Sequence, residues 1–253
     1  MNLVLLAQEE IEGDIVQLTD FRAEHIRKIL GLAVGDTLRL GIINGKLGQG
    51  KVLDLDMQTV TLKVQLDREP PPPPLVELIL ALPRPIMLQR ILKQAATLGV
   101  RRIHLLRSAK VEKSFFHSPV LLPHKLQELL LEGLQQAAVD TRLPEVCIHP
   151  QFKIFMYDLL PAMARTGCRL LAHPGLENTL PEVWPRHHKE SILLAIGPEG
   201  GWNNFEVACF QEQGFAGFTM GSRILHVDTA VTVLLGQIDL LQRISSVTTS
   251  AYL

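Results

Sequence analysis

The sequence predicts an α/β protein in two parts: a small N-terminal β-barrel and a larger domain built on a parallel sheet. Three observations predict this class. Short alternating apolar runs broken by glycines fill the first quarter of the chain, five consecutive prolines at 70–74 interrupt it, and apolar strands then alternate with amphipathic helices. The length of 253 residues also favours two domains, since one typically takes roughly 150 residues. We therefore expect domains at residues 1–72 and 73–253.

The N-terminal part is expected to contain short strands and one helix. Alternating runs at 14–18, 37–40 and 60–64 predict strands with one buried face, and glycines between them supply turns. Residues 24–32 are expected to form a short helix between the first two runs. This pattern is typical of a small β-barrel.

The proline run fixes φ and lacks backbone donors, so it predicts an extended linker. After it, helices at 86–98 and 125–138 each place apolar residues on one face, and Gly99 is expected to end the first of them. The alternation with strands predicts a largely parallel sheet. The expected strands are 76–82, 102–106, 145–148, 169–173, 192–196 and 217–220.

The composition is that of a folded protein, with 47% hydrophobic and 20% charged residues. No apolar run reaches the roughly 18 residues that a bilayer requires, and the N-terminus lacks a basic region and a cleavage site. We therefore expect a cytoplasmic protein without a membrane span.

Metal-ligand spacing is absent from the cysteines and histidines. Cys147, Cys168 and Cys209 are too far apart for a clamp and are expected to be buried thiols. His149 and the pair His187 and His188 are expected in polar loops without ligand partners. The sequence therefore predicts no metal site.

The net charge of −1 hides an uneven distribution. Residues 1–69 carry 8 basic and 11 acidic side chains, whereas residues 84–113 carry 8 basic side chains and one acid. The basic segment is either a contact surface for nucleic-acid phosphates or a solvated helix face.

The most informative segment is 193–206, in which an apolar strand leads into Gly197-Pro198-Glu199-Gly200-Gly201 and then into a helix. Asn203 and Glu206 have the spacing of a capping box at the start of that helix. The glycines allow a ligand to approach backbone amides closely, although a tight turn without ligand fits the spacing equally well. The pattern GxGxxG of dinucleotide-binding folds and the P-loop motif are both absent.

A second segment, 220–230, follows the next strand and leads into the last helix, for which Asp228 is the expected N-cap. In an open α/β sheet, the loops at the carboxyl ends of the strands form the ligand crevice. Residues 171–174, 196–201 and 220–225 are therefore expected to line one pocket. His173 and His226 are expected to flank it, more plausibly as structural groups than as proton carriers.

The pair of motifs GPEGG (197–201) and GSRILHVDTA (221–230), downstream of a basic helix ending in LGV (98–100), resembles the ribosomal small-subunit methyltransferase E family. That family methylates N3 of uracil in small-subunit ribosomal RNA. The resemblance covers most of the chain and is strongest over 193–236, and residues 25–36 resemble the family's PUA-like domain. Two departures stand out: Gly31 replaces an arginine, and 135–139 replaces a Glu-Gln-Ser-Gly-Arg segment with Arg142 slightly displaced.

The resemblance implies a SPOUT-type fold, in which the last helix is threaded through a loop as a trefoil knot and S-adenosylmethionine sits in the knot of a homodimer. Periodicity alone would predict an unknotted parallel sheet. The substrate implied is ribosomal RNA or the small ribosomal subunit. Two other functions remain open: a SPOUT enzyme that modifies another position of ribosomal or transfer RNA, and a non-catalytic RNA-binding assembly factor.

The resemblance also implies site residues. Arg223 would stabilise the charge that develops on uracil, and Glu199, if buried, would accept its proton; the alternatives are a structural salt bridge for Arg223 and a structural role in the turn for Glu199. The implied cofactor-binding residues are Leu171, His173, Gly197, Glu199, Gly201, Met220, Ser222, Ile224, Leu225, Thr229 and Ala230. The RNA-binding residues expected from the basic segments and the resemblance are Arg22, His25, Arg27, Lys28, Arg84, Arg90, Lys93 and Arg142.

Overall fold

The computed structural model describes residues 2–163, 167–185 and 191–250, with side chains as far as residue 245. The chain divides into two compact units. Unit 1 contains Met1–Pro73 together with Leu130–Leu143, and unit 2 contains Pro74–Leu129 together with Pro144–Leu253. The return of 130–143 to the first unit was not expected from the sequence.

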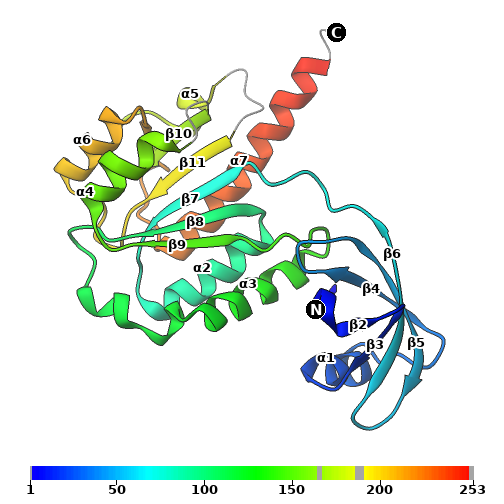
Figure 1. Ribbon diagram of the computed structural model, residues 1–253. Helices are drawn as coiled ribbons and strands as arrows, with labels where there is room; N and C mark the ends of the chain where they lie inside the picture. Colours follow the sequence, from blue (N-terminus) through cyan, green and yellow to red (C-terminus); the bar gives the residue numbers. More distant parts are fainter. Residues whose placement is uncertain (1, 164–166, 186–190, 251–253) are drawn as a thin grey trace. The chain divides into compact units, whose positions relative to one another are not determined.

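Unit 1 is a six-stranded, mostly antiparallel sheet that curls on itself, with strands in the order β1-β4-β5-β6-β3-β2 (Figure 1). Only the β1/β4 pairing is parallel. No pairing joins β1 to β2 among the described residues, so the sheet is a half-barrel with two edges and not the closed barrel that was expected. The strands are Val4–Leu6 (β1), Ile11–Glu12 (β2), Ile15–Leu18 (β3), Thr37–Ile42 (β4), Leu47–Leu55 (β5) and Val60–Arg68 (β6).

One side of this sheet packs around Val16, Leu40, Val52 and Leu62, which are almost completely buried. A second cluster explains why 130–143 joins unit 1: Leu134 packs with Leu3, Leu5 and Leu47. The backbone N–H groups of Asn2 and Leu3 donate to the carbonyl of Gln135 at 3.0 and 3.1 Å.

The predicted N-terminal helix is displaced toward the N-terminus. An α-helical turn, α1 (Phe21–Glu24), continues into a π-helical turn, η2 (His25–Ile29). It begins early because the Asp20 carboxylate accepts the backbone N–H of Arg22 at 2.9 Å as an N-cap. It ends early because Gly31 has φ of +64°. A single turn of 3-10 helix, η1 (Gln8–Glu10), lies between β1 and β2.

Unit 2 contains a six-stranded parallel sheet in the order β12-β10-β11-β7-β8-β9. Every residue of the central strand β7 is buried. The six predicted strands are therefore confirmed with boundaries shifted by one or two residues. They are Val76–Ala81 (β7), Val100–Leu106 (β8), Glu145–His149 (β9), Gly167–Ala172 (β10), Ser191–Ile196 (β11) and Ala216–Phe218 (β12).

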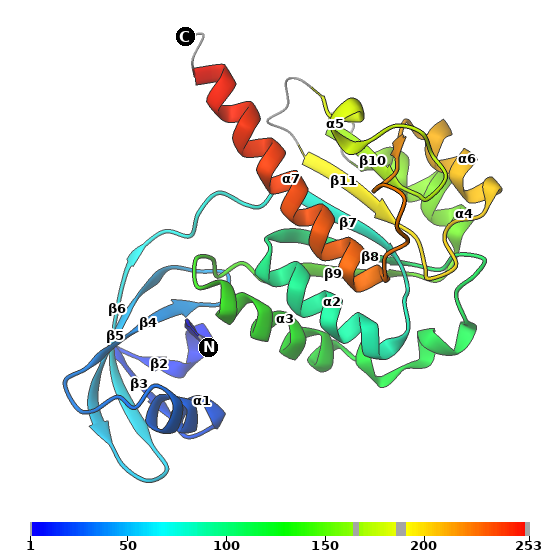
Figure 2. The same cartoon turned by 180° about the vertical axis from the view of Figure 1, so that it is seen from behind.

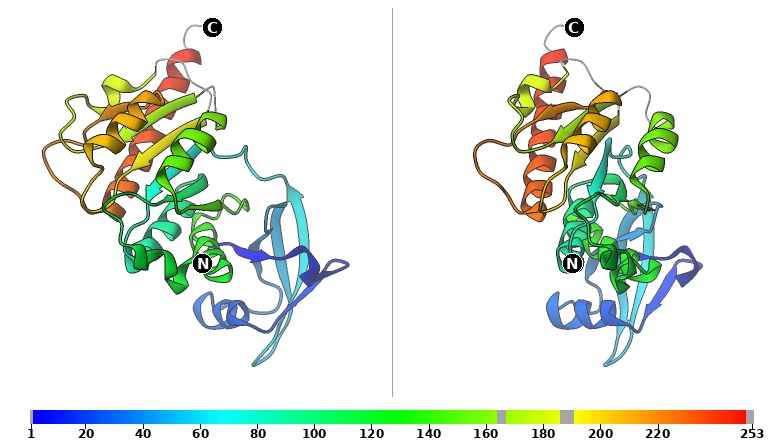
Figure 3. Two further views of the ribbon diagram at one scale, coloured as in Figure 1. Left: turned by 60° about the vertical axis from the view of Figure 1, so that its left-hand side comes forward. Right: turned by 90° about the vertical axis from the view of Figure 1, so that its left-hand side faces the viewer.

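Helices cover both faces of this sheet. The helices α2 (Pro85–Thr97) and α7 (Val227–Ser250) pack side by side on one face, and α4 (Phe152–Ile154) and α6 (Asn204–Glu212) lie on the other (Figures 1 and 2). The further views in Figure 3 show the same layers. The remaining helical segments are η3 (Lys113–His117), η4 (Pro119–Leu121), α3 (Pro123–Ala137), η5 (Phe155–Leu159), η6 (Leu160–Ala162) and α5 (Leu180–Val183).

The predicted helix ends are confirmed for α2 and α6 and wrong for α7. Gly99 follows α2 with φ of +77°, and Asn203 and Glu206 form the predicted capping box of α6. The prediction that Asp228 is an N-cap is wrong, because α7 already begins at Val227 and Asp228 lies inside its first turn. There the carboxylate accepts the backbone N–H of Thr229 at 2.9 Å. None of the helices in the described residues combines the length and hydropathy needed to span a bilayer.

The three cysteines are free, but only Cys209 is buried. Cys147 and Cys168 are half-buried, so the expectation of three buried thiols is wrong for these two. Both lie in strands, on β9 and β10, and β9 is an edge strand whose outer side has no neighbouring strand in the described sheet.

Candidate active site

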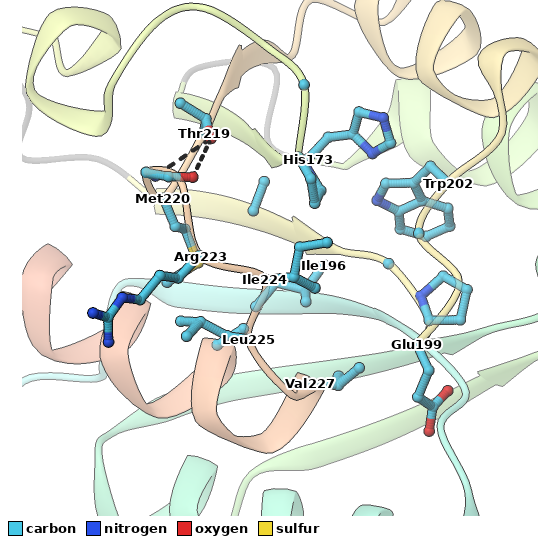
Figure 4. A pocket seen from close by; sticks show the side chains of 18 of the residues that line it. His173, Ile196, Glu199, Trp202, Thr219, Met220, Arg223, Ile224, Leu225 and Val227 are labelled. Atoms are coloured by element: carbon cyan, nitrogen blue, oxygen red, sulfur yellow. Dashed lines mark hydrogen bonds between the residues drawn. The ribbon is translucent and has the colours of Figure 1, made fainter.

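A cavity of about 280 Å³ opens at the carboxyl ends of β10, β11 and β12 in unit 2 (Figure 4). It is lined by the loop after each of these strands, at 172–175, 196–202 and 219–225, together with Val227 and Ala230 of α7. The three segments predicted to meet therefore do meet. Because β10 lies between β11 and β12 in the sheet, the parallel register brings all three loops to one edge.

The glycine-rich turn has a defined backbone. The N–H of Gly201 donates to the carbonyl of Pro198 at 2.7 Å, and Gly201 has φ of +67°. Since a residue with a Cβ rarely adopts that conformation, the turn depends on glycine at this position. Outside the turn, the Lys110 ammonium donates to the carbonyl of Gly200 at 2.5 Å. The glycines therefore form a fixed wall of the cavity.

A buried carboxylate connects this turn to the loop after β8. Glu206 is only 2% exposed, and it accepts the backbone N–H of Asn203 at 2.9 Å and that of Ala109 at 2.7 Å. The Asn203 side chain in return accepts the N–H of Glu206 at 2.8 Å. This arrangement ties the segment that carries Lys110 to the start of α6.

The walls of the cavity combine apolar side chains with two buried polar atoms that lack partners. Ile196, Leu225 and Val227 supply apolar surface. Nδ1 of His173 and Nε1 of Trp202 are buried and form no hydrogen bond within the described part of the chain. Since buried polar groups are nearly always paired, two such atoms in one cavity indicate a bound ligand with polar edges.

His173 is held neutral in this cavity. Burial lowers the pKa of its imidazole below the ordinary value of 6.5, and the nearby Lys110 ammonium lowers it further. The backbone N–H of His173 donates to the carbonyl of Phe218 at 3.0 Å, which fixes its place between β10 and β12. A neutral ring at this position does not repel a cationic ligand.

Most of the predicted cofactor residues line the cavity, and two do not. Leu171 is completely buried within β10, and Thr229 is exposed on α7 and absent from the lining. Sequence reasoning missed Trp202, which directly follows the glycine turn, and Thr219. The predicted residues that line the cavity are His173, Gly197, Glu199, Gly201, Met220, Ser222, Arg223, Ile224, Leu225 and Ala230.

The two predicted catalytic side chains point to opposite sides of the cavity (Figure 4). Arg223 is exposed and forms no salt bridge in the part of the chain that the structure describes, so the alternative of a structural ion pair is not supported. Glu199 is also exposed, which contradicts the burial that its proton-accepting role assumed. Its Oε1 accepts the backbone N–H of Arg84 at 3.3 Å, at the start of α2.

Gly197 lines the cavity, but a side chain at this position would meet Trp202 first. A Cβ added there would lie 3.1 Å from the backbone nitrogen of Trp202 and 3.2 Å from its indole Nε1. A larger side chain would therefore displace Trp202 before it filled the cavity.

The predicted RNA-binding residues fall in both units. In unit 1, Arg22 is largely buried and pairs with Glu10 and Asp20, so its side chain is committed to the fold. Arg27 donates to the carbonyl of Asp56 at 3.0 Å. Lys28 and His25 lie on the same helical segment, and Arg142 donates to the carbonyl of Pro71.

In unit 2, Arg84 and Arg90 are exposed at the start and in the middle of α2, with Lys93 one turn further on. Arg90 lies 3.6 Å from the carboxylate of Asp228 on α7. These three basic side chains therefore share one helix.

Two histidines are not where the sequence suggested. His226 is exposed and does not line the cavity. His149 ends strand β9 and does not lie in a polar loop, and its ring is 3.0 Å from that of His104. Cys147 lies beside this pair, in a cluster that local spacing did not reveal because its members come from two strands. His187 and His188 lie outside the described residues.

Comparison with known proteins gives consistent matches. A family model described as RNA methyltransferase domain matches residues 70–239. Ribosomal RNA small subunit methyltransferase E of Treponema pallidum is 31% identical over 234 residues, covering 91% of this chain and 87% of that protein. Ribosomal RNA small subunit methyltransferase E 1 of Borreliella burgdorferi is 24% identical and covers 91% of this chain and 94% of its own.

Among solved structures, that of ribosomal RNA small subunit methyltransferase E from Neisseria gonorrhoeae, bound to S-adenosyl methionine, has the same fold. The TM-score is 0.75 at 20% identity, with 95% of this chain and 98% of that chain covered. The similarity extends over both units.

Proposed function

The chain belongs to the ribosomal RNA small subunit methyltransferase E family, and on that premise we propose that it transfers the methyl group of S-adenosylmethionine to N3 of a uridine in 16S ribosomal RNA. The observation that carries the proposal is the cavity where three strand-end loops meet, with the unpartnered nitrogens of His173 and Trp202 in its walls. A family that acts on ribosomal RNA also implies a cytoplasmic enzyme.

The residues present fit this cofactor. Adenine offers a flat apolar ring with hydrogen-bonding edges, which matches a wall of Ile196 and Leu225 beside glycine backbone. Trp202 supplies an N–H donor, and Nδ1 of His173 supplies either a donor or an acceptor according to its tautomer. Because His173 is neutral, it adds no charge beside the positive sulfonium.

When bound, S-adenosylmethionine supplies an electrophilic methyl group whose bond to sulfur breaks as the bond to uracil N3 forms. Uracil N3 must lose its proton, and negative charge spreads onto the flanking carbonyl oxygens. Arg223, which lines the cavity and is exposed, would stabilise that charge by a charge-assisted hydrogen bond. Because Glu199 is exposed and its carboxylate accepts the backbone N–H of Arg84, it fits the structural alternative, and the N3 proton would pass to solvent.

The finer architecture is part of the proposal. The loop 219–225 and α7 would form a SPOUT trefoil knot around the cofactor, and the enzyme would act as a homodimer. Residues 1–72 would be a PUA-like domain that contacts RNA with Arg27, Lys28 and His25, beside a methyltransferase domain at 73–253. Arg22 pairs with Glu10 and Asp20, so it would stabilise this domain and would not contact RNA. Arg84, Arg90, Lys93 and Arg142 would contribute further phosphate contacts.

The decisive test is nucleoside analysis of the product. Purified protein, radiolabelled S-adenosylmethionine and small ribosomal subunits from a strain lacking the gene should yield labelled 3-methyluridine, identified by mass spectrometry after digestion of the RNA. A label on ribose or on another base would assign a different modification. Cofactor binding without any transfer would indicate an RNA-binding factor that kept the fold.

Arg223 provides the residue-level test. Arg223→Ala should lower the rate of methyl transfer by about 100- to 1,000-fold, the range for losing one charge-stabilising donor, with little change in cofactor affinity. Arg223→Lys should recover part of the rate, and Arg243→Ala, an exposed arginine of α7 paired with Asp239, serves as the matched control. A rate for Arg223→Ala equal to that of the control would remove Arg223 from the chemistry.

A further inference from the structure

A polar cluster lies inside the sheet of unit 2, on strands that do not form the cavity. Glu77 of β7 and His104 of β8 are 2% and 0% exposed. Cys147 and His149 of the edge strand β9 are half-buried. The cofactor cavity is lined by none of these four residues.

The parallel register explains why these side chains meet. His104 is paired with Cys147 across β8 and β9, and Leu106 with His149. Residues 147 and 149 are two apart on one strand, so both side chains point to the face of the sheet that also carries His104. Phe155 covers that face, with ring centroids 5.8 Å from His104 and 4.6 Å from His149. The cluster is thus enclosed on one side and open toward the sheet edge.

Three ligand atoms of this cluster converge. The ring nitrogens of His104 and His149, and Sγ of Cys147, all lie within 4.8 Å of one another. Nδ1 of His104 and Nε2 of His149 are 3.0 Å apart. In a tetrahedral zinc site, two imidazole nitrogens are separated by about 3.3 Å and a nitrogen and a thiolate sulfur by about 3.6 Å, from bond lengths of about 2.0–2.1 and 2.3 Å. Small rotations of Cys147 and His149, which are half-exposed, bridge the difference.

Glu77 orients the buried histidine for this role. Nε2 of His104 lies 3.2 Å from a carboxylate oxygen of Glu77, so the ring proton belongs on Nε2 and the lone pair of Nδ1 faces His149. A carboxylate that holds the far nitrogen of a ligating histidine is the usual outer partner in zinc sites. The cluster therefore contains both ligands and their support.

The charged side chains around the cluster pair with one another. The Glu77 carboxylate pairs with Arg101 and Arg102, and Arg102 also pairs with Glu145. Two carboxylates and two guanidinium groups balance one another. The Cys147 thiol donates to Glu145 at 3.4 Å and would release its proton as the ion binds. Mixed sulfur and imidazole ligands favour zinc over magnesium or calcium, which take oxygen.

We propose that His104, Cys147 and His149 bind one Zn²⁺ ion at the edge of the parallel sheet. The fourth position faces the open side and is filled by water or by a ligand from outside. The inference is independent of the methyl-transfer function, because the two sites share no residue.

The test is zinc titration of the full, untagged chain after removal of metals with a chelator. Calorimetry should show one Zn²⁺ per chain, and the Co²⁺ complex should absorb as a tetrahedral site with a thiolate-to-metal band. Cys147→Ser and His149→Ala should each weaken zinc binding by at least about 10-fold, and Cys147→Ser should remove the thiolate band. Both variants alter half-exposed positions, so they are expected to fold, which circular dichroism checks.

Two control variants locate the binding. Cys168→Ser changes the other half-buried thiol, on β10, and the double variant His187→Ala, His188→Ala changes a histidine pair elsewhere in the chain. Both should bind zinc as the unmodified chain does. Absence of zinc binding, or equal affinity in Cys147→Ser and the unmodified chain, would overturn the proposal. Methyl transfer measured in the same samples keeps failure of this site distinct from failure of the proposed activity.

Discussion

Glu206→Gln should weaken unit 2 and the cavity together. The carboxylate accepts two backbone N–H groups, at 2.7 and 2.9 Å, in a position only 2% exposed. Glutamine keeps one acceptor oxygen and turns an amide N–H₂ toward the other donor, so one bond is lost, the remaining one is no longer charge-assisted, and a buried N–H is left unpaired. Hydrogen bonds to charged groups contribute about 1.5–3 kcal/mol and neutral ones about 0.5–1.5, which gives a loss of about 2–4 kcal/mol. That is a large part of a typical stability of about 5–15 kcal/mol.

Urea unfolding followed by tryptophan fluorescence measures this loss, since both tryptophans of the chain, Trp184 and Trp202, belong to unit 2. Glu182→Gln is the matched control. Glu182 occupies the same place in a capping box, with its carboxylate accepting the N–H of Thr179 at 2.6 Å, but it is exposed. Water can replace its bond, so a much smaller shift is expected. Equal shifts in the two variants would refute the argument from burial.

Three further outcomes are expected. Trp202→Phe should reduce S-adenosylmethionine affinity by roughly 2- to 13-fold in calorimetry, the equivalent of one hydrogen bond of about 0.5–1.5 kcal/mol, and unchanged affinity would exclude the indole N–H as a donor. His173, whose pKa is lowered, stays neutral above pH 6.5, so cofactor affinity should be constant there and fall as the pH drops further and the ring gains charge beside the sulfonium; His173→Gln should abolish this fall. Arg22→Ala should lower the thermal midpoint of unit 1 at pH 7, and this difference should shrink as the pH falls below about 4.5, because Arg22 lowers the pKa of Glu10 and the pairing is lost once that carboxyl is protonated; a difference independent of pH would contradict the ion pair.

The sequence predicted the elements of unit 2 well because its signals are local. Apolar strands such as 192–196, the glycine after α2 and the Asn203 capping box each act within a few residues. The meeting of three loops followed from one general rule, that parallel strands present their carboxyl ends at one edge of the sheet. The cavity was therefore predictable as a place, although the contributions of Trp202 and Thr219 were not.

What was missed depends on contacts between distant residues. Leu134 packs with Leu3 and Leu5 in unit 1, and no local pattern distinguishes it from the rest of helix α3. Arg22 likewise forms an ion pair with Glu10, which lies twelve residues away in the sequence. A basic side chain that was predicted to bind RNA therefore pairs within the protein. A run of basic residues therefore predicts a contact surface only when those that form ion pairs within the protein are not counted.

The proposed zinc site also depends on residues that are distant in the sequence. His104 and Cys147 are separated in the sequence by a helix and several turns. Neither stands out in its strand, because β8 also carries Arg101 and Arg102 and β9 also carries Glu145 and His149. These polar side chains form one group only because the β8/β9 register sets residue 104 beside residue 147. Glu77 then lies on the other side of the His104 ring. Since β9 is an edge strand with a neighbour on one side only, an ion held jointly by β8 and β9 would add a cross-link where the sheet has fewest hydrogen bonds. Burying polar side chains costs free energy, and a bound ion would offset that cost on the strand that has a neighbour on one side only.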